Sequence, residues 1–399
     1  MSTLAWLLAP LGVEDFFADV WGAADHHVRR HDPGYFEARL PGLSTADGLL
    51  EHVRPEPSAV RSVRGYEHRD FGVYRLADGS LDLAGVRNDL ADGYTIVLDS
   101  LERYARRVTS LSHGLEVELN FPVQVNAYLT PPGSTGFLPH YDHHDVLILQ
   151  LQGSKNWHLY GDAVPPHQMQ RQRENDPHGL PSPTGPPTDV RLRAGDTLYL
   201  PRGRIHAAET AAEPSIHLTV GVHVPTVLTL LTHTVHLLSL GDDRVHARLP
   251  PRHLDDPGVR AGLGELLHDV LTAVEEPGSV AAGLDAMADL LVRRGRCPPV
   301  RQTDRVATGI DGHTRVAKHQ PLYSRVTTAP DRVTLHFAQL VVNAAPEHQA
   351  AMRFVSGSTA PFRVCDLPGL DGTRQIELAR SLIASGFLVR RPGDESADA

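Results

Sequence analysis

A series of short apolar segments separated by glycine and proline constrains the fold of this chain more than any other feature. The series runs from residue 117 to residue 223, and apolar and polar positions alternate in several of its segments. Serial strands with this punctuation are typical of a barrel or of a double-sheet jelly roll, as in the cupins. The expected strands are 123–129, 145–152, 156–160, 189–193, 196–200, 207–210 and 216–222.

The sequence before and after this series has a different character. Residues 3–30 show apolar spacings of three and four, which predict helix, and the cluster His26, His27 and His31 is expected at the end of that helix rather than at a metal. The stretch 161–188 is rich in Pro, Gly and Gln without periodicity, and we expect a loop that covers the cavity.

From Pro225 onward the pattern predicts helices and then a mixed module. Apolar residues recur at i, i+3 and i+4 in 227–240, 259–276 and 280–294, and the faces are apolar enough to predict packing between subunits. Strands are expected at 332–337 and 362–364, and a helix at 373–385 that ends at Gly386 before a strand at 387–390. We therefore expect three domains: a catalytic domain (1–225), a helical, dimer-forming region (226–300) and a winged-helix-like α+β module (301–399).

Bulk composition excludes several classes of protein. The 399 residues carry a net charge of −10, which argues against a general binder of polyanions. The arginines of the C-terminal module are scattered, so DNA binding is not expected. Two cysteines give no disulfide framework, and the apolar piece from Leu4 to Leu11 is too short to span a bilayer. A cytoplasmic location is the resulting expectation.

A candidate metal site lies at the start of the second expected strand. His140 and Asp142 are two residues apart, so in extended chain their side chains point to one side. His206 follows a later strand and a Pro-Arg-Gly turn. Two histidines and one carboxylate on one side of a metal, with the other positions open, form the arrangement of non-haem Fe(II) oxygenases.

The abundance of histidine weakens this argument, because the chain contains 24 of them. In the alternative, purely structural interpretation, His140 and His206 are surface loop residues and Asp142 caps a turn. By alternation His144 shares the side of His140, which makes it a rival ligand or a substrate contact, whereas His143 should face away.

Polar residues on neighbouring segments offer partners for an anionic cosubstrate. Lys155 opens a strand next to Trp157, so its stem can pack on apolar surface while the ammonium points inward. Asn126 and Tyr128 share one face of the first expected strand, and Thr219 lies on the last one. An exposed hairpin lysine is the alternative for Lys155.

Three stretches together resemble one known family. They are residues 126–142, residues 149–157 and residues 195–206, with the motifs NAYLTPPGSTGFLPHYD, LQLQGSKNW and GDTLYLPRGRIH. The chain is similar there to the JmjC-type ribosomal oxygenases, also called the cupin-4 family. The resemblance extends over roughly residues 85–225, and the helices and the small C-terminal module agree with it more loosely.

The resemblance implies a function and a set of site residues. Members of the family are Fe(II)- and 2-oxoglutarate-dependent dioxygenases that hydroxylate histidine or arginine in ribosomal proteins. The iron ligands fall on His140, Asp142 and His206. The basic residue for the distal carboxylate of 2-oxoglutarate falls on Lys155. Asn126, Tyr128 and Thr219 match positions near the cosubstrate, whereas Gly221 and Ser154 depart from residues that some members carry.

The sequence leaves the substrate open. A histidine or arginine side chain of a ribosomal protein competes with a peptide natural product or a free amino acid. A cupin that binds metal and a partner without turnover is a further alternative, and a transcriptional role through the C-terminal module is another.

Overall fold

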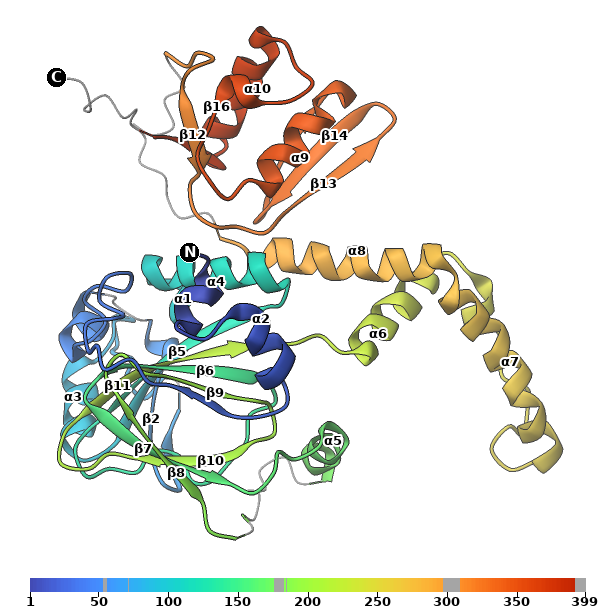
Figure 1. Ribbon diagram of the computed structural model, residues 1–399. Helices are drawn as coiled ribbons and strands as arrows, with labels where there is room; N and C mark the ends of the chain where they lie inside the picture. Colours follow the sequence, from blue (N-terminus) through green and yellow to red (C-terminus); the bar gives the residue numbers. More distant parts are fainter. Residues whose placement is uncertain (53–55, 71, 176–182, 184, 297–308, 392–399) are drawn as a thin grey trace. The chain divides into compact units, whose positions relative to one another are not determined.

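The computed structural model describes residues 1–399 except 53–55, 71, 176–182, 184, 297–308 and 392–399 (Figure 1). The chain divides into two compact units, Met1–Val224 and Pro225–Ala399. The further boundary expected near residue 300 falls within 297–308, outside the described residues.

The first unit is built on two antiparallel sheets. The larger has the strand order β1-β9-β6-β11-β5-β4-β2-β3, and the smaller has the order β10-β7-β8. The strands are β1 (His26–Val28), β2 (Val60–Arg64), β3 (Glu67–Arg69), β4 (Thr95–Leu98), β5 (Val123–Thr130), β6 (Asp145–Gln152), β7 (Ser154–Tyr160), β8 (Thr188–Arg193), β9 (Thr197–Leu200), β10 (Ile205–Glu209) and β11 (Ser215–Val222).

Along the central strands of the large sheet, successive side chains point to opposite faces of the sheet. On β5, Val125, Ala127 and Leu129 join the main core with the helices, as period-two geometry requires. The helices of this unit are α1 (Thr3–Leu8), α2 (Val13–Asp15), α3 (Leu83–Ala91), α4 (Arg106–Leu119) and α5 (Pro166–Asn175), with shorter turns η1 (Phe16–Val20), η2 (Gly48–His52), η3 (Pro57–Ala59) and η4 (Leu101–Arg103).

The opposite face of the large sheet packs against the small one. Ile148 of β6 and Trp157 of β7 belong to one buried apolar cluster that joins the two sheets. Two antiparallel sheets that enclose a core in this way form the expected jelly roll, so the predicted fold class is confirmed. A cavity remains between the sheets beside this cluster.

Two local predictions were wrong. The stretch 161–188 is not loop alone, because α5 occupies ten of its residues. His26 and His27 do not end a helix but lie in β1, which pairs with β9 at the sheet edge. His27 Nε2 lies 3.1 Å from Asp196 Oδ2, so a tertiary contact rather than local periodicity determines this segment.

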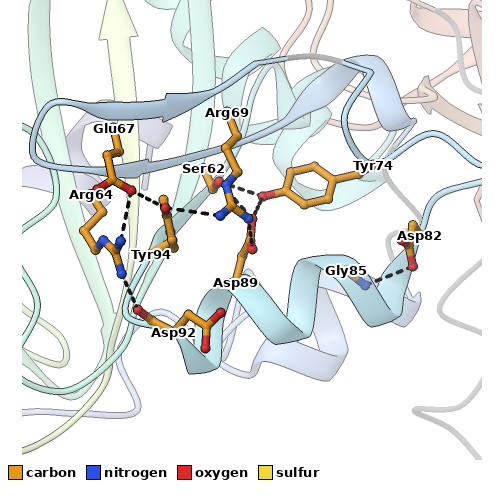
Figure 2. Close-up of polar contacts among 10 residues, drawn as sticks. All are labelled: Ser62, Arg64, Glu67, Arg69, Tyr74, Asp82, Gly85, Asp89, Asp92 and Tyr94. Atoms are coloured by element: carbon orange, nitrogen blue, oxygen red, sulfur yellow. Dashed lines mark hydrogen bonds and ion pairs between the residues drawn. The ribbon is translucent and has the colours of Figure 1, made fainter.

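A buried polar network fastens the β2–β3 edge of the large sheet to α3 (Figure 2). Asp89 of α3 is 4% exposed and accepts hydrogen bonds from Tyr74 and Arg69. Tyr74 Oη also lies 2.6 Å from Ser62 Oγ of β2. Because β2 carries Arg61, which lines the cavity, this network fixes one wall of the cavity from behind.

The second unit begins with three helices and continues into a mixed module. The helices are α6 (Val227–Leu238), α7 (Pro257–Glu275) and α8 (Pro277–Arg294), with η5 (Asp243–His246) between the first two. The module contains β12 (Arg315–Lys318), β13 (Ser324–Ala329), β14 (Arg332–Phe337), β15 (Leu340–Ala344), η7 (Pro346–His348), α9 (Gln349–Gly357), β16 (Phe362–Arg363), η8 (Val364–Asp366), α10 (Gly372–Ala384) and β17 (Leu388–Arg390).

The module has its own apolar core and two three-stranded sheets, with the orders β16-β12-β17 and β13-β14-β15. Gly386 follows α10 with φ of +81°, as a residue after a helix end often does. The resemblance of this C-terminal module to a winged helix stays a prediction. Among the described residues, no helix is long and apolar enough to cross a membrane.

Candidate metal centre

Two segments that are distant in sequence carry the predicted metal ligands. His140 and Asp142 lie in the connection between β5 and β6, and His206 lies near the start of β10. His140 N donates to His206 O at 3.0 Å, and His206 N donates to His140 O at 2.8 Å. This backbone bridge, rather than a regular strand through His140 and Asp142, brings the segments together.

The side chains of these three residues converge on one point. A ligand atom from each of His140, Asp142 and His206 lies within 4.8 Å of the others. Nδ1 of His140 lies 2.9 Å from Leu138 O, and Nδ1 of His206 lies 2.9 Å from Arg204 O. When each Nδ1 donates to its carbonyl, Nε2 keeps a lone pair for a metal, as in protein metal sites.

The charges of the cluster suit a cation. Burial favours the neutral form of Asp142, but the neighbouring imidazoles of His206 and His140 outweigh burial and hold the pKa of the carboxyl below its usual value. Burial lowers the pKa of His206 to about 4, aided by His140 and opposed by Asp142. Near pH 7 the imidazole of His206 is therefore neutral and Asp142 is a carboxylate, which are the protonation states that a divalent metal requires of these ligands.

The two extra histidines of this segment occupy different positions. His144 lines the cavity and stacks on His223 with 4.5 Å between ring centroids. It is not part of the three-residue cluster of ligand atoms. His143 does not line the cavity and contacts Tyr141 edge-on, with 5.4 Å between ring centroids.

The cavity between the sheets has a volume of about 260 Å³ and contains the cluster at one wall. The floor is formed by polar side chains from the inner faces of β5 and β11, where Asn126 pairs with Thr219 and Tyr128 with His217. Lys155 and Trp157 of β7 lie in the facing sheet. The structure thus places Asn126, Tyr128, Thr219 and Lys155, together with the three candidate ligands, in one cavity.

Lys155 is a buried cation without an acidic partner. Its side chain is almost fully enclosed, and Nζ donates to Thr130 Oγ1 at 2.9 Å. Among the described residues it forms no ion pair, and burial lowers its pKa to about 7. A buried ammonium opposite only a neutral hydroxyl is costly, so the site favours an anionic ligand.

Two further buried groups of the cavity lack partners among the described residues. They are the Nε1 donor of Trp157 and Nδ1 of His217. Burial, reinforced by the charge of Lys155, holds the pKa of His217 well below its usual value. Unsatisfied buried polar atoms are rare in folded proteins, and here both residues lie in the neighbourhood of Lys155. A carboxylate of a bound ligand would satisfy them.

Asn126 and Tyr128 have protein partners in addition to facing the cavity. Asn126 Oδ1 accepts from Ser100 N at 2.9 Å, which leaves its amide NH₂ for a ligand. Tyr128 stacks on His217 with 4.7 Å between centroids, and burial raises the pKa of its hydroxyl to about 12. Tyr128 is therefore a donor throughout the physiological pH range.

Two residues of the site were missed in the sequence. Thr130, the partner of Lys155, follows Tyr128 by two positions on the same strand, so the period-two pattern would have placed it on the same face of β5. Arg61 of β2 lines the cavity and pairs with Asp99, with 2.7 Å between Nε and Oδ2. It carries no motif and comes from a strand far earlier in the chain, so no local signal marks it.

A family model described as the JmjC domain matches residues 105–230. The bifunctional lysine-specific demethylase and histidyl-hydroxylase NO66 of Aedes aegypti is 25% identical over 367 residues, which are 91% of this chain and 55% of that protein. Ribosomal oxygenase 2 of Mus musculus is 33% identical over 226 residues, which are 54% of this chain and 46% of that protein. The chain spans about half the length of these curated relatives.

Solved structures show the same fold. YcfD of Escherichia coli, a ribosomal oxygenase whose structure is described as a complex with cobalt and 2-oxoglutarate, superposes with a TM-score of 0.58. The match covers 96% of this chain and 99% of that chain at 16% sequence identity. At this identity the likeness establishes the architecture.

Proposed function

We propose that this chain, whose residues 105–230 match the JmjC domain and which is similar to ribosomal oxygenases, is an Fe(II)- and 2-oxoglutarate-dependent dioxygenase. One observation carries the proposal: the cluster His140, Asp142 and His206 shares a cavity with the buried ammonium of Lys155, which has no acidic partner among the described residues. A metal-ligand set beside an anion site suits a metal-chelating dicarboxylate.

Each cavity residue has a distinct role in this proposal. His140, Asp142 and His206 would hold the iron, which supplies activation of O₂ coupled to oxidative decarboxylation of 2-oxoglutarate to succinate and CO₂. Lys155 pairs with the far carboxylate of the cosubstrate. Asn126, Tyr128 and Thr219 contact it from the floor, and the apolar walls keep water from the reacting atoms.

The substrate that we propose is a side chain of a ribosomal protein, histidine or arginine. Support comes from the names of the relatives, which include ribosomal oxygenases and a histidyl-hydroxylase. The net charge of −10 is complementary to the basic surface of ribosomal proteins, although it carries less weight. A peptide natural product or a free amino acid remains the competing substrate.

Turnover of 2-oxoglutarate tests the reaction class. Purified protein with Fe(II) should release CO₂ from 2-oxoglutarate, and Asp142→Ala should abolish substrate-coupled release because one ligand of the cluster is lost. Arg202→Ala, which changes a residue outside the cavity lining, is a matched control. Near-normal turnover in Asp142→Ala would contradict the metal site, and no release by the parent protein would favour a non-catalytic binding module.

Mass spectrometry tests the substrate. Ribosomal proteins from cells with and without this protein should differ by one added oxygen atom on a single histidine or arginine. If every ribosomal protein has the same mass in the cells with and without this protein, a peptide natural product or a free amino acid becomes the better candidate for the substrate.

We also propose that the protein is a cytoplasmic homodimer that pairs through the helices of its second unit. Large apolar side chains are exposed on α6, among them Leu228 at 71% and Leu231 at 41%. Exposed apolar clusters of this kind commonly mark interfaces. Light scattering should give twice the mass of the chain, and Leu228→Lys with Leu231→Lys should give the monomer mass.

A further inference from the structure

Helix α5 consists mostly of good helix formers but has no apolar stripe that would bury one of its faces. Its ten residues, PHQMQRQREN, are almost all polar. A helix of this length is marginal in water by itself, so contacts elsewhere must hold it. Met169 is 3% exposed and Gln172 is partly buried, while the remaining residues of α5 are exposed. The two enclosed residues lie three positions apart, on one face of the helix.

Both enclosed residues contact the segments that carry the metal ligands. Tyr141, between His140 and Asp142, donates from its hydroxyl to Gln172 Oε1 at 2.9 Å. The sulfur of Met169 lies 3.3 Å from the point where a β-carbon on Gly203 would be. Gly203 belongs to the turn that precedes His206. The single contact face of α5 thus touches both ligand-bearing segments at once.

Backbone hydrogen bonds continue this connection to the ligands themselves. Just before α5, Val164 N donates to Gly203 O at 2.8 Å, and Gly203 N donates to Asp142 O at 2.9 Å. Gly203 has φ of +84°, and a β-carbon there would lie 2.3 Å from Val164 O. Val164, Gly203 and Asp142 therefore form a continuous chain of contacts in which no larger residue fits at Gly203.

We propose that α5 is a strap that positions the metal ligands. The inference rests on the proposed metal site. Met169 and Gln172 hold the two ligand-bearing segments at a fixed separation, so that Asp142 and His206 are preorganised for the metal. They act through Tyr141 and Gly203 and touch neither metal nor substrate, so they are positioning residues. Outer contacts that orient ligands commonly change metal affinity by about 10- to 100-fold.

The test is Co(II) affinity of the full-length, metal-free protein, measured by calorimetry and by the visible absorption of the bound ion. The double variant Met169→Ala with Gln172→Ala should bind Co(II) about tenfold more weakly than the parent. Gln170→Ala, on the exposed face of the same helix, should bind as the parent does. Met169→Leu keeps the apolar contact and should retain the parent affinity.

Three results would overturn the strap or its premise. Equal Co(II) affinity in the double variant and the parent would show that α5 does not position the ligands. An equal loss in Gln170→Ala would show that helix stability alone matters. No binding by the parent would refute the metal site, and the strap with it. Where Met169→Ala impairs folding by circular dichroism, Gln172→Ala alone carries the test, because it leaves the apolar contact in place.

Discussion

The ammonium of Lys155 in the small sheet lies 2.9 Å from the hydroxyl of Thr130 in the large sheet. Thr130 is neutral, and the centroid of the Trp157 ring lies 5.9 Å from the ammonium. The protein alone therefore stabilises this charge poorly, and the pKa of Lys155 falls to about 7 because of burial. Because the buried ammonium destabilises the ligand-free protein, a bound anion that pairs with it stabilises the protein more.

Lys155→Met should separate stability from binding. The substitution removes a buried charge and keeps most of the apolar stem, so the metal-free protein should gain about 1–3 kcal/mol in its free energy of unfolding at pH 7. Affinity for 2-oxoglutarate should be lost, because no cation remains for its far carboxylate. Urea unfolding and titration with 2-oxoglutarate measure the two effects. A variant that binds 2-oxoglutarate normally would show that Lys155 has another role.

Binding of 2-oxoglutarate should weaken as pH rises through 7. The folded-state pKa of Lys155, about 7, is below the ordinary value of 10.5. Only the protonated amine pairs with a carboxylate, so affinity should fall above pH 7 by up to about tenfold per pH unit. Lys155→Arg keeps its charge at these pH values and should lose this dependence. Titrations from pH 6.5 to 9 make the comparison, and identical profiles would contradict it.

The lowered pKa of Lys155 has the opposite effect on the stability of the ligand-free protein, which rises with pH. Between about pH 7 and 10.5 the unfolded chain binds a proton at Lys155 that the folded chain does not. The free energy of unfolding therefore gains a contribution that rises with pH across this window. The contribution is absent in Lys155→Met, which serves as its control.

The site residues that the sequence identified are those that regular strands position. Asn126 and Tyr128 follow strict alternation on β5, and Lys155 is the second residue of β7, close after the turn from β6, so local pattern and burial agree. Sequence pattern alone could not predict how the two segments that carry the metal ligands meet. His140 is not in a regular strand, and its approach to His206 depends on a backbone bridge between distant segments.

Helix α5 and strand β1 show why other parts could not be predicted. The residues of α5 have high helix propensity, but with Met169 as its one buried residue the segment shows no apolar periodicity that would predict a helix. His26 and His27 continue a helical pattern, yet pairing with β9 and the contact of His27 with Asp196 place them in a strand. In β1 tertiary contacts therefore override local preference, whereas in α5 they supply the apolar contact that the sequence pattern lacks.

Asp89→Ala should destabilise the first unit without a change in the metal ligands. The carboxylate is buried and accepts hydrogen bonds from Tyr74 and Arg69, which would both lose a partner (Figure 2). Loss of such a buried acceptor costs about 2–4 kcal/mol in the free energy of unfolding. Asp82→Ala, which removes the hydrogen bond to Gly85 N at 2.9 Å and thereby the cap of α3, should cost about 1 kcal/mol. Chemical denaturation distinguishes the two, and equal losses would contradict a special role for Asp89.

Gly221 makes room for His144, and a double-variant cycle can measure this. A β-carbon on Gly221 would lie 2.6 Å from both Cδ2 and Nε2 of the His144 ring, which lines the cavity and stacks on His223. Gly221→Ala should therefore cost about 1–3 kcal/mol by overpacking. In a His144→Ala background the ring is gone, and the same substitution should cost little. The difference between the two costs, obtained from urea unfolding of the four proteins, is the coupling between the residues. A cost of Gly221→Ala that is the same in both backgrounds would show that the backbone of β11, and not His144, requires glycine at this position.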